Sequence, residues 1–289
     1  MLFIFWFLIL VSKRIANVAN YFILLHFTKI KYFVKKIISL LTSKLSRQTL
    51  IRMSYIFGFL VRPFYWGKGV ECPICGRHFR KFLPYGYGEA KDNRLCPKCL
   101  SLERHRLLWI YLKERTDFFT ANLKVLHVAP EQPYLKRFKS LKNLDYTTAD
   151  LDSPIADIHL DVMKMDIPDN TYDVVICNHV LEHVKDANVA MKEILRVLKP
   201  DGWAILLVPI RMDVDTYEDP SVTDPKERQR LYGQYDHVRQ FGRDYTDYIA
   251  KAGFTPFADD IYYTLGDKAQ TMRLARPGEE LIYGGRKKS

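Results

Sequence analysis

The sequence predicts an α/β fold: a doubly wound, mostly parallel sheet of seven strands, preceded by a small four-cysteine segment and a helical N-terminal arm. Three observations predict it. After Asn122, short apolar runs alternate with amphipathic segments of helical period, which is typical of a doubly wound sheet. Four of the five cysteines form two C-x-x-C pairs, and the first 70 residues hold 11 Lys or Arg and no Asp or Glu.

The positive charge of the chain is confined to the arm. The 289 residues carry a formal net charge of +11, whereas residues 71–289 hold 33 basic and 33 acidic residues. The excess therefore needs an explanation separate from the folded part of the chain. A neutral balance over residues 71–289 also argues against a broad nucleic-acid-binding face.

The arm, residues 1–70, begins with eleven apolar residues, followed at once by Lys13 and Arg14. Eleven helical residues rise about 17 Å, short of a bilayer core of roughly 30 Å. Since the charges follow the apolar run, a secretory signal is not predicted either. From Lys29 to Leu45, apolar side chains follow helical spacing with lysines between them. This basic amphipathic pattern predicts that residues 1–52 contact an anionic membrane surface; packing on the folded domain, or a start at Met53, are the alternatives.

The cysteine pairs predict a structural zinc centre in residues 71–115, which comprise a zinc ribbon and a connecting helix. The ligands are Cys72, Cys75, Cys96 and Cys99, in the spacing C-x2-C-x20-C-x2-C. Four thiolates suit tetrahedral zinc and leave no open position for catalysis, with an iron–sulfur site as the second choice. Reduced cysteines of this kind favour a cytoplasmic protein. The fifth, Cys177, lies in an apolar run and is expected to be a buried free thiol.

The sheet is predicted in the third region, residues 116–289. Helices are expected at 102–113, 134–141, 187–198 and 244–252. The expected strands are 124–128, 146–149, 158–160, 173–177, 203–209, 257–263 and 281–284. Because ligands bind at the carboxyl ends of such strands, the polar residues that follow them are the candidate site.

Glu71 to about Phe254 resembles class I S-adenosylmethionine-dependent methyltransferases of the type-11 group, and within it a bacterial branch with an N-terminal zinc ribbon. The strings CPICG, LPYG, SLERHRLLW, VLHVAPE, NHVLEHV, RVLKPDGW and DHVRQFG carry the resemblance. It implies a Rossmann-like methyltransferase fold, an enzyme and S-adenosylmethionine as cofactor.

The resemblance also implies which residues bind the cofactor. The first turn holds His127, Ala129 and Glu131, where most of the superfamily is glycine-rich; this chain has no glycine there. The missing glycines put the backbone path of this turn in doubt.

Two carboxylates follow the next strands. Asp150 ends a strand, as does the acidic residue that accepts ribose hydroxyls in dinucleotide folds, with a solvated loop residue as the alternative. Asp161 and Val162 match the family segment in which the aspartate accepts from the adenine amino group and the next amide faces the ring. Twelve residues separate Asp161 from Asp173, as in the family.

The fourth strand is followed by Asn178-His179-Val180-Leu181-Glu182-His183. Read literally, the string contains H-x-x-E-H, a motif of zinc metallopeptidases, but no third ligand stands out downstream. Since similar strings occur in these methyltransferases, we place Asn178 and His179 against the methionine end of the cofactor and His183 at a helix start.

The polar stretch from Arg211 to Arg243 is long enough to form a lid. In it, His237 is predicted to be a general base with Asp236 beside it, and Arg239 a clamp for a carboxylate or phosphate of the substrate. A loop held by salt bridges is the alternative.

We therefore expect a cytoplasmic methyltransferase, peripheral on the inner face of the membrane, that methylates a small or lipid-linked acceptor. The alternatives are RNA methylation with the ribbon as substrate grip, and a non-catalytic binding module with a degenerate cofactor pocket.

Overall fold

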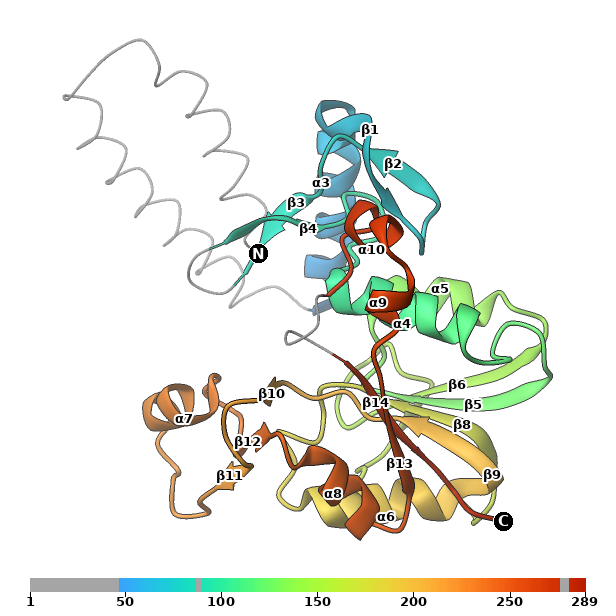
Figure 1. Cartoon of the computed structure of the whole chain (residues 1–289), viewed down its shortest axis with the longest axis vertical. Helices are drawn as coiled ribbons and strands as arrows, with labels where there is room; N and C mark the ends of the chain where they lie inside the picture. The colour runs from blue at the N-terminus through green and yellow to red at the C-terminus, as the bar shows by residue number, and fades with distance from the viewer. Residues whose placement is uncertain (1–46, 87–89, 276–280) are drawn as a thin grey trace. The chain divides into compact units, whose positions relative to one another are not determined.

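The computed structural model describes residues 47–86, 90–275 and 281–289 (Figure 1). The chain forms two units, residues 1–102 and 103–289. The predicted helix at 29–45 and most of the arm lie outside the described residues. Within the described residues, no helix is long and apolar enough to cross a membrane.

The described part of the first unit is one helix and two small hairpins. Helix α3 packs its Val61 and Tyr65 face inward, and Gly58 allows close approach, because a Cβ there would lie 2.6 Å from the Pro97 carbonyl oxygen. The elements are α3 (Arg47–Tyr65), β1 (Trp66–Cys72), β2 (Arg77–Phe79), β3 (Leu83–Tyr85) and β4 (Lys91–Leu95), with β1 paired to β2 and β3 paired to β4.

The second unit is built on the predicted seven-stranded sheet, in the order β13-β14-β9-β8-β5-β6-β7. All neighbours from β9 to β7 are parallel, and β14 is antiparallel to both β13 and β9. The sheet strands are β5 (Leu123–Val128), β6 (Leu144–Asp150), β7 (Ile158–His159), β8 (Tyr172–Cys177), β9 (Leu198–Ile205), β13 (Thr255–Asp259) and β14 (Ile282–Arg286).

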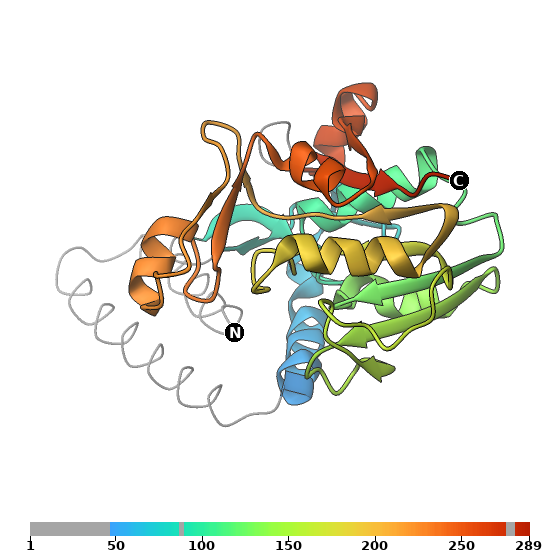
Figure 2. The same cartoon turned by 90° about the horizontal axis from the view of Figure 1, so that it is seen from below.

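Helices cover both faces of this sheet (Figure 1). Helices α4 (Glu103–Glu114) and α5 (Gln132–Lys139) lie on one face, and α6 (Ala187–Val197) and α8 (Tyr245–Lys251) on the other. Figure 2 shows α6 lying along the sheet beside α8. The fold class is confirmed.

The two faces have different cores, because side chains of a strand alternate between them. On β5, Leu126 and Val128 join the aliphatic core with α6 and α8, whereas His127 lies among Tyr134, Phe138 and other aromatic rings. His127 is thus fully buried on the α5 side.

Two sequence expectations differ from the structure. The strand expected at 257–263 ends at Asp259, and the short helix α9 (Ile261–Thr264) follows; α10 (Asp267–Thr271) comes next. The apolar residues of segment 257–263 are too few to distinguish a strand from a single helical turn by their spacing. The connecting helix at 102–113 belongs to the second unit, where Arg106 donates from Nε to the Met272 carbonyl at 2.8 Å.

The stretch expected to form a lid folds as a small three-stranded sheet with one helix. Its elements are β10 (Ile210–Arg211), β11 (Tyr217–Glu218), α7 (Pro225–Tyr232) and β12 (Arg239–Gly242), with β12 between β10 and β11. It lies beyond the carboxyl ends of the parallel strands in both views (Figures 1 and 2).

Candidate active site and cysteine centre

The four predicted cysteines meet in one buried cluster. The Sγ atoms of Cys72 and Cys99 are 3.5 Å apart, and those of Cys75 and Cys96 are 3.7 Å apart. Sulfurs bonded to tetrahedral zinc at 2.3 Å lie about 3.8 Å from one another. The cluster therefore fits a zinc ribbon. Cys177 is absent from it; it is buried in β8, and burial raises the pKa of its thiol.

Each C-x-x-C pair sits on a tight turn. The Gly76 amide donates to the Cys72 carbonyl at 2.8 Å, and the Leu100 amide donates to the Cys96 carbonyl at 3.0 Å. Both residues have left-handed backbones, with φ of 62° and 59°. Glycine adopts this conformation freely, whereas for leucine it costs about 1–2 kcal/mol. The string CPICG therefore predicted the favourable turn at Gly76. Nothing in the sequence indicated that Leu100 would adopt the same backbone conformation.

At the carboxyl edge of the large sheet, two neighbouring strands end in left-handed residues that are not glycine. Ala129 follows β5 with φ of 49°, and His179 follows β8 with φ of 54°. Their amides continue the sheet pairing, to the carbonyls of Ala149 at 2.8 Å and Leu207 at 2.7 Å. Strained residues of this kind concentrate at functional sites. The turn at Ala129 thus follows a left-handed path that glycine would favour, which answers the doubt raised by the missing glycines.

A buried carboxylate joins these two strand ends. Glu131 accepts a 2.6 Å hydrogen bond from His127 Nε2 and a 3.1 Å bond from Asn178 Nδ2. The Tyr146 hydroxyl lies 2.7 Å from His127 Nδ1 and fixes the ring from the other side. His127 therefore positions Glu131, while Ala129, Glu131, Asn178 and His179 lie together at the β5 and β8 ends.

The pKa of the Glu131 carboxyl is far below its ordinary value. Burial alone would raise its pKa, but the hydrogen bond and charge of His127, with the charge of His105, lower it to about 2. Glu131 is therefore an ionised carboxylate at neutral pH, suited to an ammonium group.

The two predicted aspartates lie at the ends of adjacent strands. Asp150 ends β6 and pairs with His159 of β7, two residues before Asp161. Asp150 Oδ1 accepts the amides of Asp152 and Ser153, and Asp161 Oδ1 accepts the Met163 amide at 2.8 Å. In each carboxylate the second oxygen has no hydrogen bond to the described part of the chain.

Three buried polar atoms at this edge lack a partner among the described residues. They are Ser153 Oγ, Asn178 Oδ1 and Glu182 Oε2, in residues that are 2–3% exposed. Unpartnered buried polar atoms are rare and costly, so they indicate a polar ligand. With the carboxylates at β6 and β7, the residues present fit an adenosine and amino-acid ligand such as S-adenosylmethionine.

The turn after β8 and the turn before β12 bring further polar groups together. His183 and His237 have ring centroids 4.7 Å apart, and Glu182 lies within reach of both. His237 Nδ1 lies 3.0 Å from the Tyr232 carbonyl oxygen, which can only accept, so the lone pair is on Nε2. Burial lowers the pKa of His237. Asp236, predicted as its neighbour, instead lies 3.5 Å from His183 Nδ1.

Two predictions about this region need correction. His183 is not at a helix start, because α6 begins at Ala187 with Asp186 as its N-cap. Arg239 is 1% exposed and donates all its N–H groups within the protein, to Glu218 and to three carbonyls of the turn after β8. A saturated, buried guanidinium has no donor left for a substrate, so Arg239 holds the turn in place and is not a clamp.

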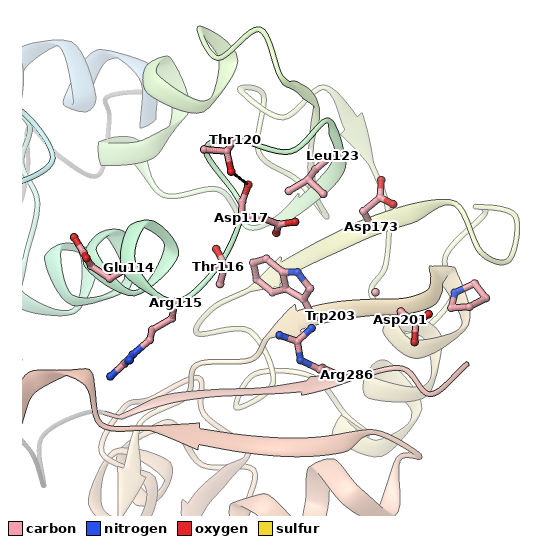
Figure 3. Close-up of a pocket in the computed structure, with 12 residues that line it drawn as sticks. Glu114, Arg115, Thr116, Asp117, Thr120, Leu123, Asp173, Asp201, Trp203 and Arg286 are labelled. Carbon is pink, nitrogen blue, oxygen red and sulfur yellow. Dashed lines mark hydrogen bonds between the residues drawn. The ribbon is translucent and has the colours of Figure 1, made fainter. Parts of the chain in front are cut away.

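A groove of about 680 Å³ lies at the opposite, amino-terminal edge of the sheet (Figure 3). Its lining comes from the end of α4 and the loop after it, from the first residues of β5 and β8, from residues 200–203 of β9, and from Arg286 at the end of β14. Ligands of doubly wound sheets bind at the other edge. We therefore do not assign the cofactor to this groove.

The strand order, the reversed β14 and the polar carboxyl edge define a class I methyltransferase fold. The family model described as a methyltransferase domain matches residues 114–206, from the end of α4 through β9. The match covers about a third of the chain. With the fold and the polar edge, it identifies the protein as an S-adenosylmethionine-dependent methyltransferase.

Solved structures with the same general arrangement include the YcgJ protein from Bacillus subtilis, with 15% identity, a TM-score of 0.44, and coverage of 64% of this chain and 100% of that one. The 1,6-didemethyltoxoflavin-N1-methyltransferase from Burkholderia thailandensis has 15% identity, a TM-score of 0.41, and coverage of 64% and 83%. An S-adenosylmethionine-dependent methyltransferase from Mesorhizobium loti has 12% identity, a TM-score of 0.40, and coverage of 62% and 97%. At such values we base no conclusion on them. A search of the curated proteins finds no match.

Proposed function

We propose that the chain binds S-adenosylmethionine across the carboxyl ends of β5, β6, β7 and β8 and methylates a small or lipid-linked acceptor. The observation that carries the proposal is the set of polar groups at this edge, where left-handed turns at Ala129 and His179 flank the ionised Glu131. The cofactor supplies the methyl group on an activated sulfonium, so the protein's task is to bind, align and manage a proton.

Each end of the cofactor has candidate partners. Glu131, held by His127 and Asn178, suits the ammonium of the methionine portion. Asp150 has an oxygen left for the ribose hydroxyls, and Asp161 with the Val162 amide would receive the adenine edge. The left-handed backbone at Ala129 argues against the alternative of a degenerate pocket, because the turn keeps its shape without glycine.

The acceptor would enter on the side of His183 and His237. The lone pair on His237 Nε2 faces away from the Tyr232 carbonyl and can receive a proton or another electron-pair acceptor. The acceptor's nucleophilic atom forms a bond to the methyl carbon as the carbon–sulfur bond breaks and S-adenosylhomocysteine leaves, and the acceptor's proton passes to His237 Nε2 or to solvent water.

Isothermal titration calorimetry with S-adenosylmethionine and S-adenosylhomocysteine tests the proposal. We expect both to bind, with micromolar affinity as an order of magnitude. If neither ligand binds at about 1 mM, the proposed function is rejected. A steep salt dependence of binding to bulk RNA would instead favour the alternative of RNA methylation.

We further propose a structural zinc ion at the four cysteines. The support is their burial and Sγ separations of 3.5 and 3.7 Å. Elemental analysis of the reduced protein should find one zinc per chain at this centre, removable only with loss of the ribbon's fold.

We also propose that the N-terminal region contacts an anionic membrane surface. Among the residues that the structure describes, the support for this contact is a set of exposed apolar side chains on α3 and directly after it. Ile56, Leu60 and Phe64 form one helical stripe, and Phe59 and Trp66 adjoin it; each is 61–73% exposed. With no acidic residue before Glu71, the preferred surface is anionic lipid. In flotation assays with phosphatidylglycerol vesicles, the double variant Phe59→Ser/Phe64→Ser should bind about 10–100-fold more weakly. Equal binding of wild type and variant would exclude this surface.

A further inference from the structure

The turn after β8 and the turn before β12 form a second cluster of metal-ligating side chains. Glu182, His183 and His237 each offer one ligand atom, and these atoms lie within 4.8 Å of one another. The H-x-x-E-H string contributes only Glu182 and His183 here; His237 comes from 54 residues further along the chain. The structure thus supplies the third ligand that the sequence lacked.

Glu182 itself indicates a cationic ligand. Its residue is 2% exposed, and Oε2 has no partner in the described part of the chain. His179 Nδ1 lies 3.5 Å from the other oxygen, Oε1. A buried carboxylate with an open oxygen is costly unless a charge or hydrogen-bond donor meets it.

The two histidines are oriented as metal ligands usually are. His237 donates from Nδ1 to the Tyr232 carbonyl at 3.0 Å, and His183 Nδ1 lies 3.5 Å from Asp236 Oδ2. Metal-bound histidines typically use one ring nitrogen for the metal and direct the other to a carbonyl or carboxylate. This arrangement leaves both Nε2 atoms for a ligand.

We propose that Glu182, His183 and His237 bind a divalent transition-metal ion, with zinc, cobalt or manganese as fitting ions. Two imidazoles and one carboxylate are a common ligand set for such ions. Zinc bonds of about 2.0–2.2 Å place tetrahedral ligand atoms about 3.4 Å apart, so binding draws the three side chains together. Three protein ligands leave a position open, in contrast to the four-cysteine centre.

The open position defines the acceptor class, an inference that rests on the proposed function. A hydroxyl-bearing acceptor would place its oxygen on the ion, which lowers the pKa of that hydroxyl. The proton leaves to solvent water, and the oxygen forms its bond to the methyl carbon as the carbon–sulfur bond breaks. His237 is then a ligand, and this role replaces the general base predicted from the sequence.

The test is metal binding to the full chain with its ribbon already loaded with zinc. Titration with CoCl2 and MnCl2 should show one further site, and cobalt there should give ligand-field absorption without the thiolate charge-transfer band of cobalt in a cysteine centre. Glu182→Gln and His237→Ala should bind the ion roughly 100-fold more weakly or more, because even second-shell changes cost about 10–100-fold. Glu227→Gln, the same change on the exposed face of α7, should bind as wild type does.

Uptake by Glu182→Gln equal to that of wild type, or no second ion in wild type, would overturn the proposal. The thermal unfolding midpoint of each variant shows whether it is folded, and S-adenosylmethionine affinity measured on the wild type separates the two proposals. If the cofactor binds and the second ion does not, only the metal site fails. If the ion binds and the cofactor does not, the proposed function fails.

Discussion

The four-cysteine centre and the carboxyl edge of the sheet relate ligand and fold in opposite ways. The cysteines come from two short turns that join small hairpins, so a bound zinc ion would contribute to the folding free energy of this region. At the sheet edge, the strands and the buried Arg239 fix the turns before any ligand arrives. In the first region the proposed ligand would stabilise the fold, and in the second the fold positions the side chains before the ligand binds.

The largest expected effect is on the ribbon. Cys96→Ser should abolish zinc binding and unfold the ribbon, since structural zinc contributes on the order of 10 kcal/mol. Limited proteolysis should then cleave within residues 66–102 and leave residues 103–289 resistant. Cys177→Ala, outside the cluster, should keep the zinc. A ribbon that resists protease without zinc would break the comparison.

Removal of Arg239 tests whether the fold prepares the edge. Arg239→Met leaves the carbonyls of Leu181, Val184 and Lys185 without their donor, and should lower the free energy of unfolding by about 3–5 kcal/mol in urea titrations. Arg243→Met is the control, because its ion pair with Asp215 is exposed and should contribute about 0.5 kcal/mol or less. Equal losses for the two variants would contradict the assigned role.

Glu131 gives the edge a defined pH dependence. Its pKa is about 2 in the fold, so its stabilisation is complete above the ordinary value near 4.5 and is lost as the pH falls towards 2. At pH 7, the free energy of unfolding of the wild type should exceed that of Glu131→Gln by about 3 kcal/mol. Unfolding titrations from pH 7 to pH 2 should show that gap shrink only below about pH 4.5. A gap that changes between pH 7 and 5, or one matched by exposed Glu114→Gln, would contradict the assignment.

Asp150 should affect binding more than folding. Asp150→Asn keeps the Oδ1 acceptor for the amides of Asp152 and Ser153 but removes the charge. A lost charged hydrogen bond costs about 1.5–3 kcal/mol, so S-adenosylmethionine affinity should fall about 10–150-fold by calorimetry. Asp152→Asn, its exposed neighbour, should leave the affinity unchanged. An unchanged affinity in Asp150→Asn would remove the ribose assignment.

The smallest effect concerns the strained turn. Ala129→Gly relieves about 1–2 kcal/mol of left-handed strain and loses about 0.5–1 kcal/mol to backbone entropy, so it should stabilise the protein by up to about 1.5 kcal/mol. Ala190→Gly, within helix α6, should destabilise it by about 1 kcal/mol or more. If both variants lose stability equally in thermal unfolding, Ala129 is not strained.

The alternating α/β order, the cysteine cluster and the carboxylates at strand ends could all be predicted from the amino-acid sequence. These features depend on local spacing, because period, turn residues and C-x-x-C pairs are written within a few residues of one another.

The tertiary structure alone decided what depends on distant partners. It buried Arg239 against the turn after β8, joined Glu131 to His127 and Asn178, and brought His237 to Glu182 and His183. The left-handed backbone at Ala129 and Leu100 could not be predicted from the sequence either, because neither residue favours that conformation and only the surrounding fold imposes it.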